Sequence, residues 1–325
     1  MDRPDLGDSR PGGQSGRIVN THKAVMINTL YFRKICVGWT KTTWILALLI
    51  WPAIRLTAQH ADGGMAKSPT FGVCSSMATS GLLKDIGFAF VEGSVGRDLM
   101  PGKSDADFAG KVKEFDTCRL PVISCNGFLP GTLKVTGPEA RPDTVLRYAE
   151  VAFRRAATVG IRYIVFGSSG ARSIPDGFSR DQARTQFIDL LKRMGPVAGK
   201  YGITVAIENL QKSETNFINT VGEALSIARE VNHPNIRLLA DIFHMMRENE
   251  GPEAILEAGD YLVHCHIAEL KDRTAPGMAG DDFRPYFNAL KQIGYRGGIS
   301  IEGSWKNENL PKAYQVLAEQ WETKQ

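Results

Sequence analysis

The sequence predicts an α/β protein, a single (β/α)8 TIM barrel preceded by an N-terminal leader, and three observations support this fold class. Short apolar runs alternate with helical patterns at intervals of about 30 residues from residue 71 onward. Eight such runs occur, which is the number of strands that closes this kind of barrel. No Gly-x-Gly-x-x-Gly pattern follows the first run, which argues against an open dinucleotide-binding sheet.

The eight apolar runs have the length and composition of buried parallel strands. They cover residues 71–74, 88–91, 122–125, 163–166, 204–207, 236–240, 262–266 and 298–301. Helical patterns cover residues 143–159, 180–201, 221–231, 251–258, 282–293 and 310–321. Ser179 and Thr220 stand where N-caps begin two of these helices, and Gly160 and Gly202 stand where helices end. We therefore expect the C-terminal strand ends to share one rim, where barrels of this kind carry their active sites.

Residues 1–67 have a different character from the barrel region. Residues 1–25 are rich in Gly, Arg, Asp and Pro and contain few apolar residues, so we expect them to be disordered. The apolar run 44–51 follows basic residues, precedes small ones and is too short for a stable membrane span, which is typical of a signal peptide. We expect a catalytic domain over residues 68–325, exported once the leader is cleaved, with a cytoplasmic location as the alternative.

The formal net charge of +4 is concentrated in the leader. Residues 1–67 hold nine Lys and Arg against four Asp and Glu, which leaves 30 against 31 in the rest of the chain. The barrel region lacks the basic excess that neutralises phosphates, so we expect no nucleic-acid partner. The five cysteines show no Cys-x-x-Cys spacing, so neither a disulfide framework nor a zinc ribbon is indicated.

Four ionisable residues close the last four predicted strands. Glu208, Asp241, His266 and Glu302 are separated by 33, 25 and 36 residues, about one β/α unit each, so a closed barrel brings them to one rim. Three carboxylates and one imidazole suit one divalent metal ion, with Mn²⁺, Mg²⁺ or Co²⁺ favoured and Zn²⁺ as a further candidate. His264 lies on the same strand face as His266 and is an alternative ligand.

Two residues of earlier strands are candidates for substrate binding. Glu92 follows the second predicted strand and Asn126 follows the third, so both side chains are expected at the same rim. Residues 168–170, Ser-Ser-Gly, follow the fourth strand without the pattern of a phosphate-binding loop. Phosphorylated substrates are therefore not indicated.

The segments 207–209, 241–245, 264–269 and 301–303 resemble the xylose-isomerase-like barrel superfamily, in particular hydroxypyruvate isomerases and tagatose/psicose 3-epimerases. The similarity covers about residues 70–321. It implies that the positions of Glu208, Asp241, His266 and Glu302 bind one divalent ion. It also implies that Glu208 and Glu302 act as an acid/base pair on opposite faces of a small carbohydrate substrate.

The same resemblance implies further substrate contacts. His244 and Glu214 would bind substrate hydroxyls, and Arg273 matches an arginine that hydroxypyruvate isomerases direct at the substrate. Removing a proton next to a carbonyl needs an electrophile that stabilises an enediolate and a base within hydrogen-bond reach. The sequence therefore predicts a metal-dependent isomerase or epimerase of a small keto-sugar or hydroxy-carbonyl compound.

Several alternatives stay open at this point. A metal-dependent lyase, dehydratase or hydratase acting on a keto-sugar or inosose would use the same enediolate and the same bases. An endonuclease-IV-like repair enzyme would need more histidines near the strand ends than this chain has, because His22, His60 and His233 stand elsewhere. A sugar-binding barrel without activity would bind no metal. Whether the chain forms homo-oligomers is also open.

Overall fold

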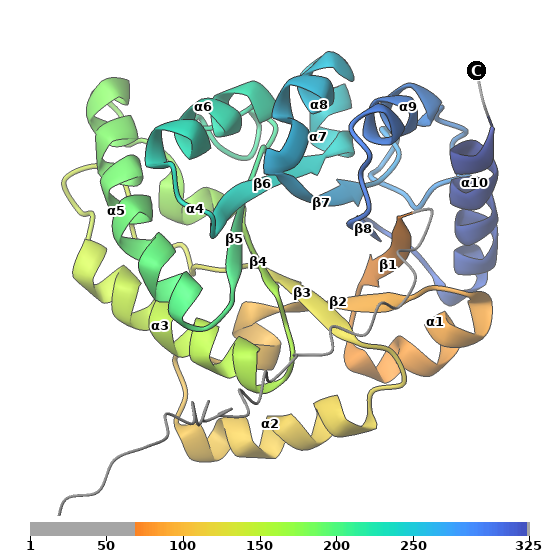
Figure 1. Cartoon of the computed structure of the whole chain (residues 1–325), viewed down its shortest axis with the longest axis horizontal. Helices are drawn as coiled ribbons and strands as arrows, with labels where there is room; N and C mark the ends of the chain where they lie inside the picture. The colour runs from red at the N-terminus through yellow and green to blue at the C-terminus, as the bar shows by residue number, and fades with distance from the viewer. Residues whose placement is uncertain (1–68, 324–325) are drawn as a thin grey trace, which may run out of the picture. The chain divides into compact units, whose positions relative to one another are not determined.

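The computed structural model describes residues 69–323, which form a closed barrel of parallel strands in the order β1 to β8. Figure 1 shows the strands as a central ring with the helices around it. The strands are β1 Thr70–Cys74, β2 Phe90–Ser94, β3 Val122–Asn126, β4 Tyr163–Phe166, β5 Thr204–Glu208, β6 Ile236–Asp241, β7 Leu262–Ile267 and β8 Gly298–Ile301. The predicted (β/α)8 fold is thus confirmed. The predicted leader lies outside the described residues.

The second strand begins later than the sequence suggested. The predicted strand covered residues 88–91, whereas β2 runs from Phe90 to Ser94. The apolar residue Phe88 instead packs outside the strand ring, with its ring centroid 5.2 Å from that of Tyr314. Because β2 continues to Ser94, Glu92 lies inside the strand rather than at its end, and it pairs with Cys74 of β1.

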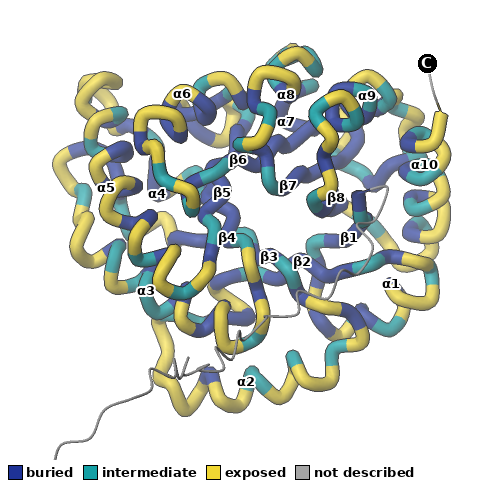
Figure 2. The backbone as a smooth tube through the Cα atoms, viewed as in Figure 1, coloured by how far each residue is buried: buried dark blue, intermediate teal, exposed yellow. Residues whose placement is uncertain are grey.

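The helices cover the outside of the barrel. They are α1 Ser80–Ile86, α2 Asp105–Thr117, α3 Pro142–Thr158, α4 Ser169–Arg172, α5 Arg180–Lys200, α6 Val221–Val231, α7 Ile242–Arg247, α8 Glu253–Ala258, α9 Arg284–Gln292 and α10 Leu310–Glu322. Figure 2 shows buried strands in the centre and exposed residues along the outer helix faces. This burial pattern is that of amphipathic helices packed on a sheet whose own residues are enclosed on both sides.

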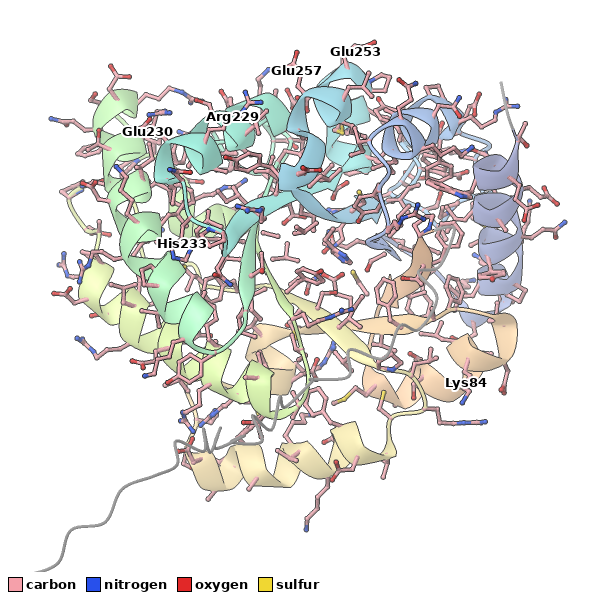
Figure 3. All side chains as sticks on the ribbon, in the orientation of Figure 1. Lys84, Arg229, Glu230, His233, Glu253 and Glu257 are labelled. Carbon is pink, nitrogen blue, oxygen red and sulfur yellow. The ribbon has the colours of Figure 1, made fainter. Side chains whose placement is uncertain are left out.

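Charged side chains follow the outer faces of these helices. Lys84, Arg229, Glu230, Glu253 and Glu257 are all exposed, and Figure 3 labels them on α1, α6 and α8. None of the helices described here combines the length and the hydropathy that a membrane span requires.

Replacing Thr220 with alanine is expected to lower the free energy of unfolding by about 1 kcal/mol. The Thr220 hydroxyl accepts the backbone N–H of Glu223 at 3.0 Å and so caps α6, as predicted. Urea denaturation followed by circular dichroism measures the loss. Thr185 is a matched control because it is exposed inside α5, where its hydroxyl donates a hydrogen bond to the carbonyl of Asp181 and caps no helix end. Equal losses for Thr220→Ala and Thr185→Ala would contradict the capping role.

The interior of the barrel contains an apolar part and a polar part. The apolar part is a small cluster of Val165, Ala206 and Leu239. The polar part, here called the Glu92 network, consists of Glu92, Ser124, His264 and Ser300, all fully buried. Barrel interiors are usually filled by branched apolar side chains, so buried polar groups at this depth call for a specific reason.

Candidate functional site

Four side chains from four consecutive strands meet at the C-terminal end of the barrel. Glu208 and Asp241 are the last residues of β5 and β6, His266 is the last but one of β7, and Glu302 directly follows β8. Each offers a ligand atom, and these atoms all lie within 4.8 Å of one another. These residues, here called the four-residue cluster, are those that the sequence singled out as metal ligands.

The imidazole of His266 is contacted at both nitrogens. Its Nδ1 lies 3.0 Å from Oε1 of Glu208 and 3.2 Å from Oε2 of Glu302. Its Nε2 lies 2.9 Å from Oε1 of Glu92. Burial alone would lower the pKa of His266, but the carboxylates of Glu92 and Glu302 outweigh burial and raise this pKa well above its usual value. His264 instead directs its Nε2 at Glu92, at 2.6 Å, so it lies outside the four-residue cluster.

The two glutamates of the cluster have different electrostatic surroundings. Burial alone would raise the pKa of Glu302, but His266 and Arg273 outweigh burial and lower this pKa to about 2. Burial raises the pKa of Glu208, and the neighbouring carboxylate of Glu302 adds to this effect although His266 opposes it. One glutamate is thus held ionised while the other takes up a proton more readily, which is how surroundings separate a base from an acid.

Asp241 faces the cluster and also caps a helix. Its Oδ1 accepts the backbone N–H of His244 at 3.2 Å, at the start of α7. Its own N–H donates to Oδ1 of Asn209 at 2.9 Å. Burial raises the pKa of Asp241 to about 6, although the Arg273 guanidinium, 3.2 Å from Oδ2, opposes this shift. Asn209 therefore fixes the position of Asp241 from the neighbouring strand.

The four-residue cluster fits a divalent cation. Its three buried or half-buried carboxylates repel one another, and a cation between them removes this repulsion. Carboxylate oxygens with one imidazole nitrogen are the donors that Mn²⁺, Mg²⁺, Co²⁺ or Zn²⁺ accept in proteins. Nε2 of His266 contacts Glu92, and its Nδ1 faces the carboxylates of Glu208 and Glu302.

Mn²⁺ binding is expected to weaken as the pH falls through about 6, the raised pKa of Asp241. Below that pH Asp241 takes up a proton, whereas a metal ion needs the ionised carboxylate. Because the metal ion then has to displace this proton, the affinity falls about tenfold for each pH unit below the pKa. Calorimetric titration of the protein with Mn²⁺ at pH 5, 6 and 7 measures the effect. An affinity that changes less than about twofold between pH 5 and pH 7 would contradict this competition.

Arg273 reaches the cluster from the loop after β7. Its Nη2 lies 2.6 Å from Oε2 of Glu302, and its guanidinium carbon lies 4.8 Å from the centroid of the Phe243 ring. The backbone has φ +57° at Asp272 and +50° at Arg273, which non-glycine residues seldom adopt. The buried carboxylate of Glu269 holds this loop by accepting the N–H groups of Gly277, Ala279, Gly280 and Asp281.

His244 and Glu214 lie beside the cluster. Nε2 of His244 is 3.4 Å from Oδ2 of Asp241 and 3.9 Å from Oε1 of Glu214. Within residues 69–323, neither nitrogen of this fully buried ring has a hydrogen-bond partner. Burial lowers the pKa of His244 to about 4, so the ring is neutral at pH 7. A neutral imidazole without partners is suited to bind a ligand hydroxyl.

The cluster borders a pocket of about 280 Å³. Five predicted site residues line it: Asn126, Glu208, Glu214, Arg273 and Glu302. Asn126 ends β3 and donates from Nδ2 to Oε1 of Glu302 at 2.6 Å. Gly167 directly follows β4 and forms the wall beside Glu208, where an added methyl group would overlap Oε2 of that glutamate.

Glu92 and His244 are predicted substrate-binding residues that do not line this pocket. Because β2 extends to Ser94, Glu92 points into the barrel and is 0% exposed. Burial alone would raise its pKa, but the imidazoles of His266 and His264 outweigh burial and hold the pKa well below its usual value. The predicted contact with substrate does not agree with this placement, since both carboxylate oxygens already contact protein groups.

Three residues at the cluster were not singled out in the sequence. They are Cys74, whose Sγ lies 4.0 Å from Nε2 of His266, together with Gly167 and Asn209. Their signal in the sequence is position alone, because Cys74 ends β1, Gly167 follows β4 and Asn209 follows β5. A search of all eight strand ends would have found them.

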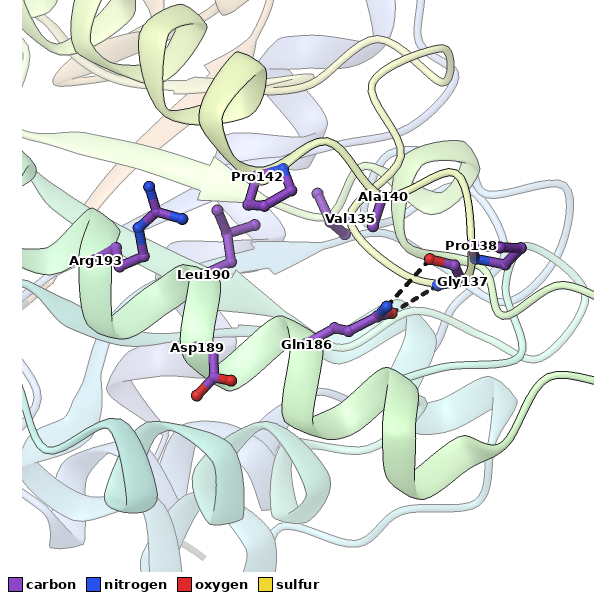
Figure 4. A pocket seen from close by; sticks show the side chains of 9 residues that line it. All are labelled: Val135, Gly137, Pro138, Ala140, Pro142, Gln186, Asp189, Leu190 and Arg193. Atoms are coloured by element: carbon purple, nitrogen blue, oxygen red, sulfur yellow. Dashed lines mark hydrogen bonds between the residues drawn. The ribbon is translucent and has the colours of Figure 1, made fainter.

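A second cavity, of about 380 Å³, lies outside the barrel, between the loop before α3 and the helix α5. Figure 4 shows Gln186 among the lining residues, with two hydrogen bonds between its side-chain amide and the main chain of Gly137. Its lining includes one carboxylate, Asp189, and one guanidinium, Arg193, which is not a set of metal ligands. Figure 3 labels His233, which lies in the α6–β6 connection and so precedes the end of β6 opposite to Asp241.

Comparisons with known proteins identify sugar epimerases as relatives. The L-ribulose 3-epimerase of Methylomonas sp. (strain DH-1) is 35% identical over 167 residues, which are 50% of this chain and 56% of that enzyme. The L-ribulose 3-epimerase of Mesorhizobium japonicum is 28% identical over 251 residues, 73% of this chain and 80% of that enzyme. The chain thus spans little more than half the length of the first of these relatives.

The comparison with solved structures supports the fold. A crystal structure of D-psicose 3-epimerase in the presence of D-fructose superposes with a TM-score of 0.68 at 19% identity, covering 78% of this chain and all of that one. The family described as xylose isomerase-like TIM barrel matches residues 81–322, most of the described barrel. The chain therefore belongs to the xylose isomerase-like TIM barrel family.

Proposed function

We propose that this protein is a divalent-metal-dependent epimerase or isomerase that acts on a small keto-sugar or hydroxy-carbonyl compound through an enediolate. The observation that carries the proposal is the position of the two glutamates. Glu208 of β5 and Glu302 after β8 approach the same Nδ1 of His266 from different strands, at 3.0 and 3.2 Å. Two carboxylates around one reacting carbon are what a reaction with proton transfer on both faces requires.

The residues of the cluster divide the chemistry between them. One divalent ion, held by Glu208, Asp241, His266 and Glu302, would supply the positive charge that stabilises the enediolate. Glu302, held in position by Asn126 and Arg273, takes the proton from the carbon next to the carbonyl. Glu208 returns a proton to the opposite face, or to the neighbouring carbon when the reaction is an isomerisation.

Groups in and beside the pocket are suited to orient a sugar. His244 is fully buried beside the pocket and has two ring nitrogens without hydrogen-bond partners among residues 69–323, and Glu214 of the pocket lining lies 3.9 Å from one of them. Both are suited to bind the hydroxyls of a substrate chain. Arg273 reaches the pocket wall while its Nη2 contacts Glu302, so it holds that carboxylate in position and adds positive charge near the developing oxyanion. The relatives support a ketose as substrate, because they are named as L-ribulose 3-epimerases.

Deuterium exchange tests this proposal. The full-length protein is incubated with L-ribulose or D-psicose in D₂O, with and without Mn²⁺, and the sugars are followed by NMR. Exchange that depends on Mn²⁺ and yields an epimer or isomer supports the proposal. Loss of water from the sugar instead indicates the lyase or dehydratase reaction at the same site. No exchange and no Mn²⁺ binding would exclude both reactions.

We also propose that residues 1–67 direct export. The proposal rests on the basic, apolar and small residues that follow one another around the run 44–51. Expressing the full-length chain in a bacterial host, fractionating the cells and sequencing the N-terminus of the product tests it. An uncleaved product found only in the cytoplasm would contradict this proposal and would leave the proposed activity untouched.

A further inference from the structure

We propose that Glu92 is the positioning residue of the metal site, which holds the imidazole of His266 with Nε2 protonated and Nδ1 directed at Glu208 and Glu302. The proposal rests on the function proposed above. It gives Glu92 a role that differs from the substrate contact expected from the sequence. It also explains why the barrel interior contains polar side chains below the cluster.

The hydrogen bonds of Glu92 favour one arrangement of protons. A carboxylate only accepts hydrogen bonds, so each polar group in contact with Glu92 has to donate. Ser300 and Ser124 donate from Oγ to Oε2 at 2.7 and 3.0 Å. His264 and His266 approach with Nε2, at 2.6 Å from Oε2 and 2.9 Å from Oε1. A neutral His266 that donates from Nε2 has its lone pair on Nδ1, which is the atom that faces the cluster.

The surroundings hold Glu92 and its partners in place. All members of the Glu92 network are 0% exposed. The ring of His264 stacks on Tyr163 at a centroid distance of 6.1 Å and an interplanar angle of 15°, and Phe90 covers it at 6.0 Å. Gly298 provides the space for Phe90, since a methyl group there would lie 2.7 Å from the ring. The carboxylate therefore cannot move without disturbing a closely packed layer.

This arrangement explains why β7 carries two histidines separated by one residue, in the pattern His264-Cys265-His266. Both imidazoles lie on one face of β7 and bind the two oxygens of a single carboxylate, and Cys265 points to the outer core. His264 thus acts through Glu92, and His266 is the residue that reaches the cluster. Carboxylate partners of metal-binding histidines fix the ring orientation and raise the basicity of the ligand, so their loss weakens metal binding about 10- to 100-fold.

The variant Glu92→Gln tests the proposal. Glutamine has nearly the same size but only one acceptor oxygen, so it cannot accept hydrogen bonds from both histidines. We expect the dissociation constant for Mn²⁺, measured by calorimetry on the full-length protein, to rise about 10- to 100-fold. We also expect the Mg²⁺-loaded unchanged protein to give the ¹⁵N NMR signals of a single Nε2–H tautomer of His266, and the Mg²⁺-loaded variant to lose them.

Glu250→Gln is the matched control. Glu250 is half-buried and its carboxylate accepts the backbone N–H groups of Val221 and Gly222, at 2.9 and 3.2 Å, on the outer helices. Its replacement is expected to leave Mn²⁺ binding and the His266 tautomer unchanged. A Glu92→Gln variant that binds Mn²⁺ as tightly as the control, with His266 still in the Nε2–H form, would overturn the proposal.

Ser300→Ala keeps the proposal testable if Glu92→Gln does not fold. It removes one donor to Glu92 with a small change in volume, so we expect several-fold weaker Mn²⁺ binding in a folded protein. Unchanged Mn²⁺ binding in this variant would then overturn the positioning role. If the unchanged protein itself binds no Mn²⁺, the proposed function fails instead, so the two failures are distinguishable.

Discussion

Glu302→Gln is expected to lower kcat for epimerisation by about 10²- to 10⁴-fold, the usual contribution of a positioned general base. The amide keeps the volume of the side chain and one oxygen for a metal ion, but it cannot take up the proton. The contacts of Glu302 with Asn126 and Arg273, both at 2.6 Å, hold its carboxylate in a defined position, so the loss affects proton transfer rather than sugar binding. NMR assays in D₂O at saturating Mn²⁺ measure the loss.

Two further variants test whether the loss of activity is specific to Glu302. Glu308→Gln changes an exposed glutamate a few residues away and is expected to leave kcat unchanged. Glu208→Gln removes the second carboxylate. We expect Glu302→Gln and Glu208→Gln each to retain deuterium exchange with at most one of the two sugars, the substrate or its epimer. If Glu302→Gln keeps kcat within about tenfold of the unchanged protein, equal to roughly 1.4 kcal/mol, the assignment of the base is wrong.

Gly167→Ala is expected to lower kcat/KM by about 10²-fold, because a misplacement of about 1 Å in a catalytic group costs this much. The added methyl group would overlap Oε2 of Glu208 and lie 3.1 Å from its Cδ, so the carboxylate has to leave its position. Gly167 is not among the residues with positive φ, so alanine fits the backbone itself. The NMR assay in D₂O measures the loss of activity, and a calorimetric Mn²⁺ titration shows whether Mn²⁺ binding is also weakened.

Gly110→Ala is the control for this substitution. Gly110 lies in α2, and a methyl group there meets no described atom within 4 Å. The change is expected to leave activity unchanged and to stabilise the helix by up to about 1 kcal/mol. Activity of Gly167→Ala within about threefold of this control would contradict the role of Gly167 as the wall beside Glu208.

The fold and the four-residue cluster could be predicted because both follow from repetition. In a parallel barrel all strands end at the same rim. The position of an acid or imidazole that closes an apolar run is therefore known from the strand pattern alone. Asp241 and Glu208 are of this kind. The alternation of side chains along a strand also placed His264 and His266 on one face and Cys265 on the other, as the structure has them.

The contacts that depend on register and on loops could not be predicted in this way. The apolar run 88–91 places the end of the second strand before Glu92, but β2 continues through the polar residues Glu92 and Ser94, and their place in the strand follows from pairing with β1 and β3 rather than from hydropathy. Gly167 matters through the position of Glu208 on the neighbouring strand. Arg273 reaches the cluster through a loop with two left-handed residues, for which local sequence gives no rule, so resemblance alone indicated it.

The pairing of β1 with β8, through which Thr70 lies beside Gly298 and Val73 beside Ile301, has a consequence for folding. The ring closes only when the last strand joins the first, a contact between residues more than 200 positions apart, and such contacts form late. Glu302 follows that last strand, so a nascent chain that ends before Gly298 exposes an open sheet edge and lacks one of the four residues proposed to hold a metal ion. We therefore expect Mn²⁺ binding only after β8 is complete, and the open sheet edge of the partly made barrel favours aggregation.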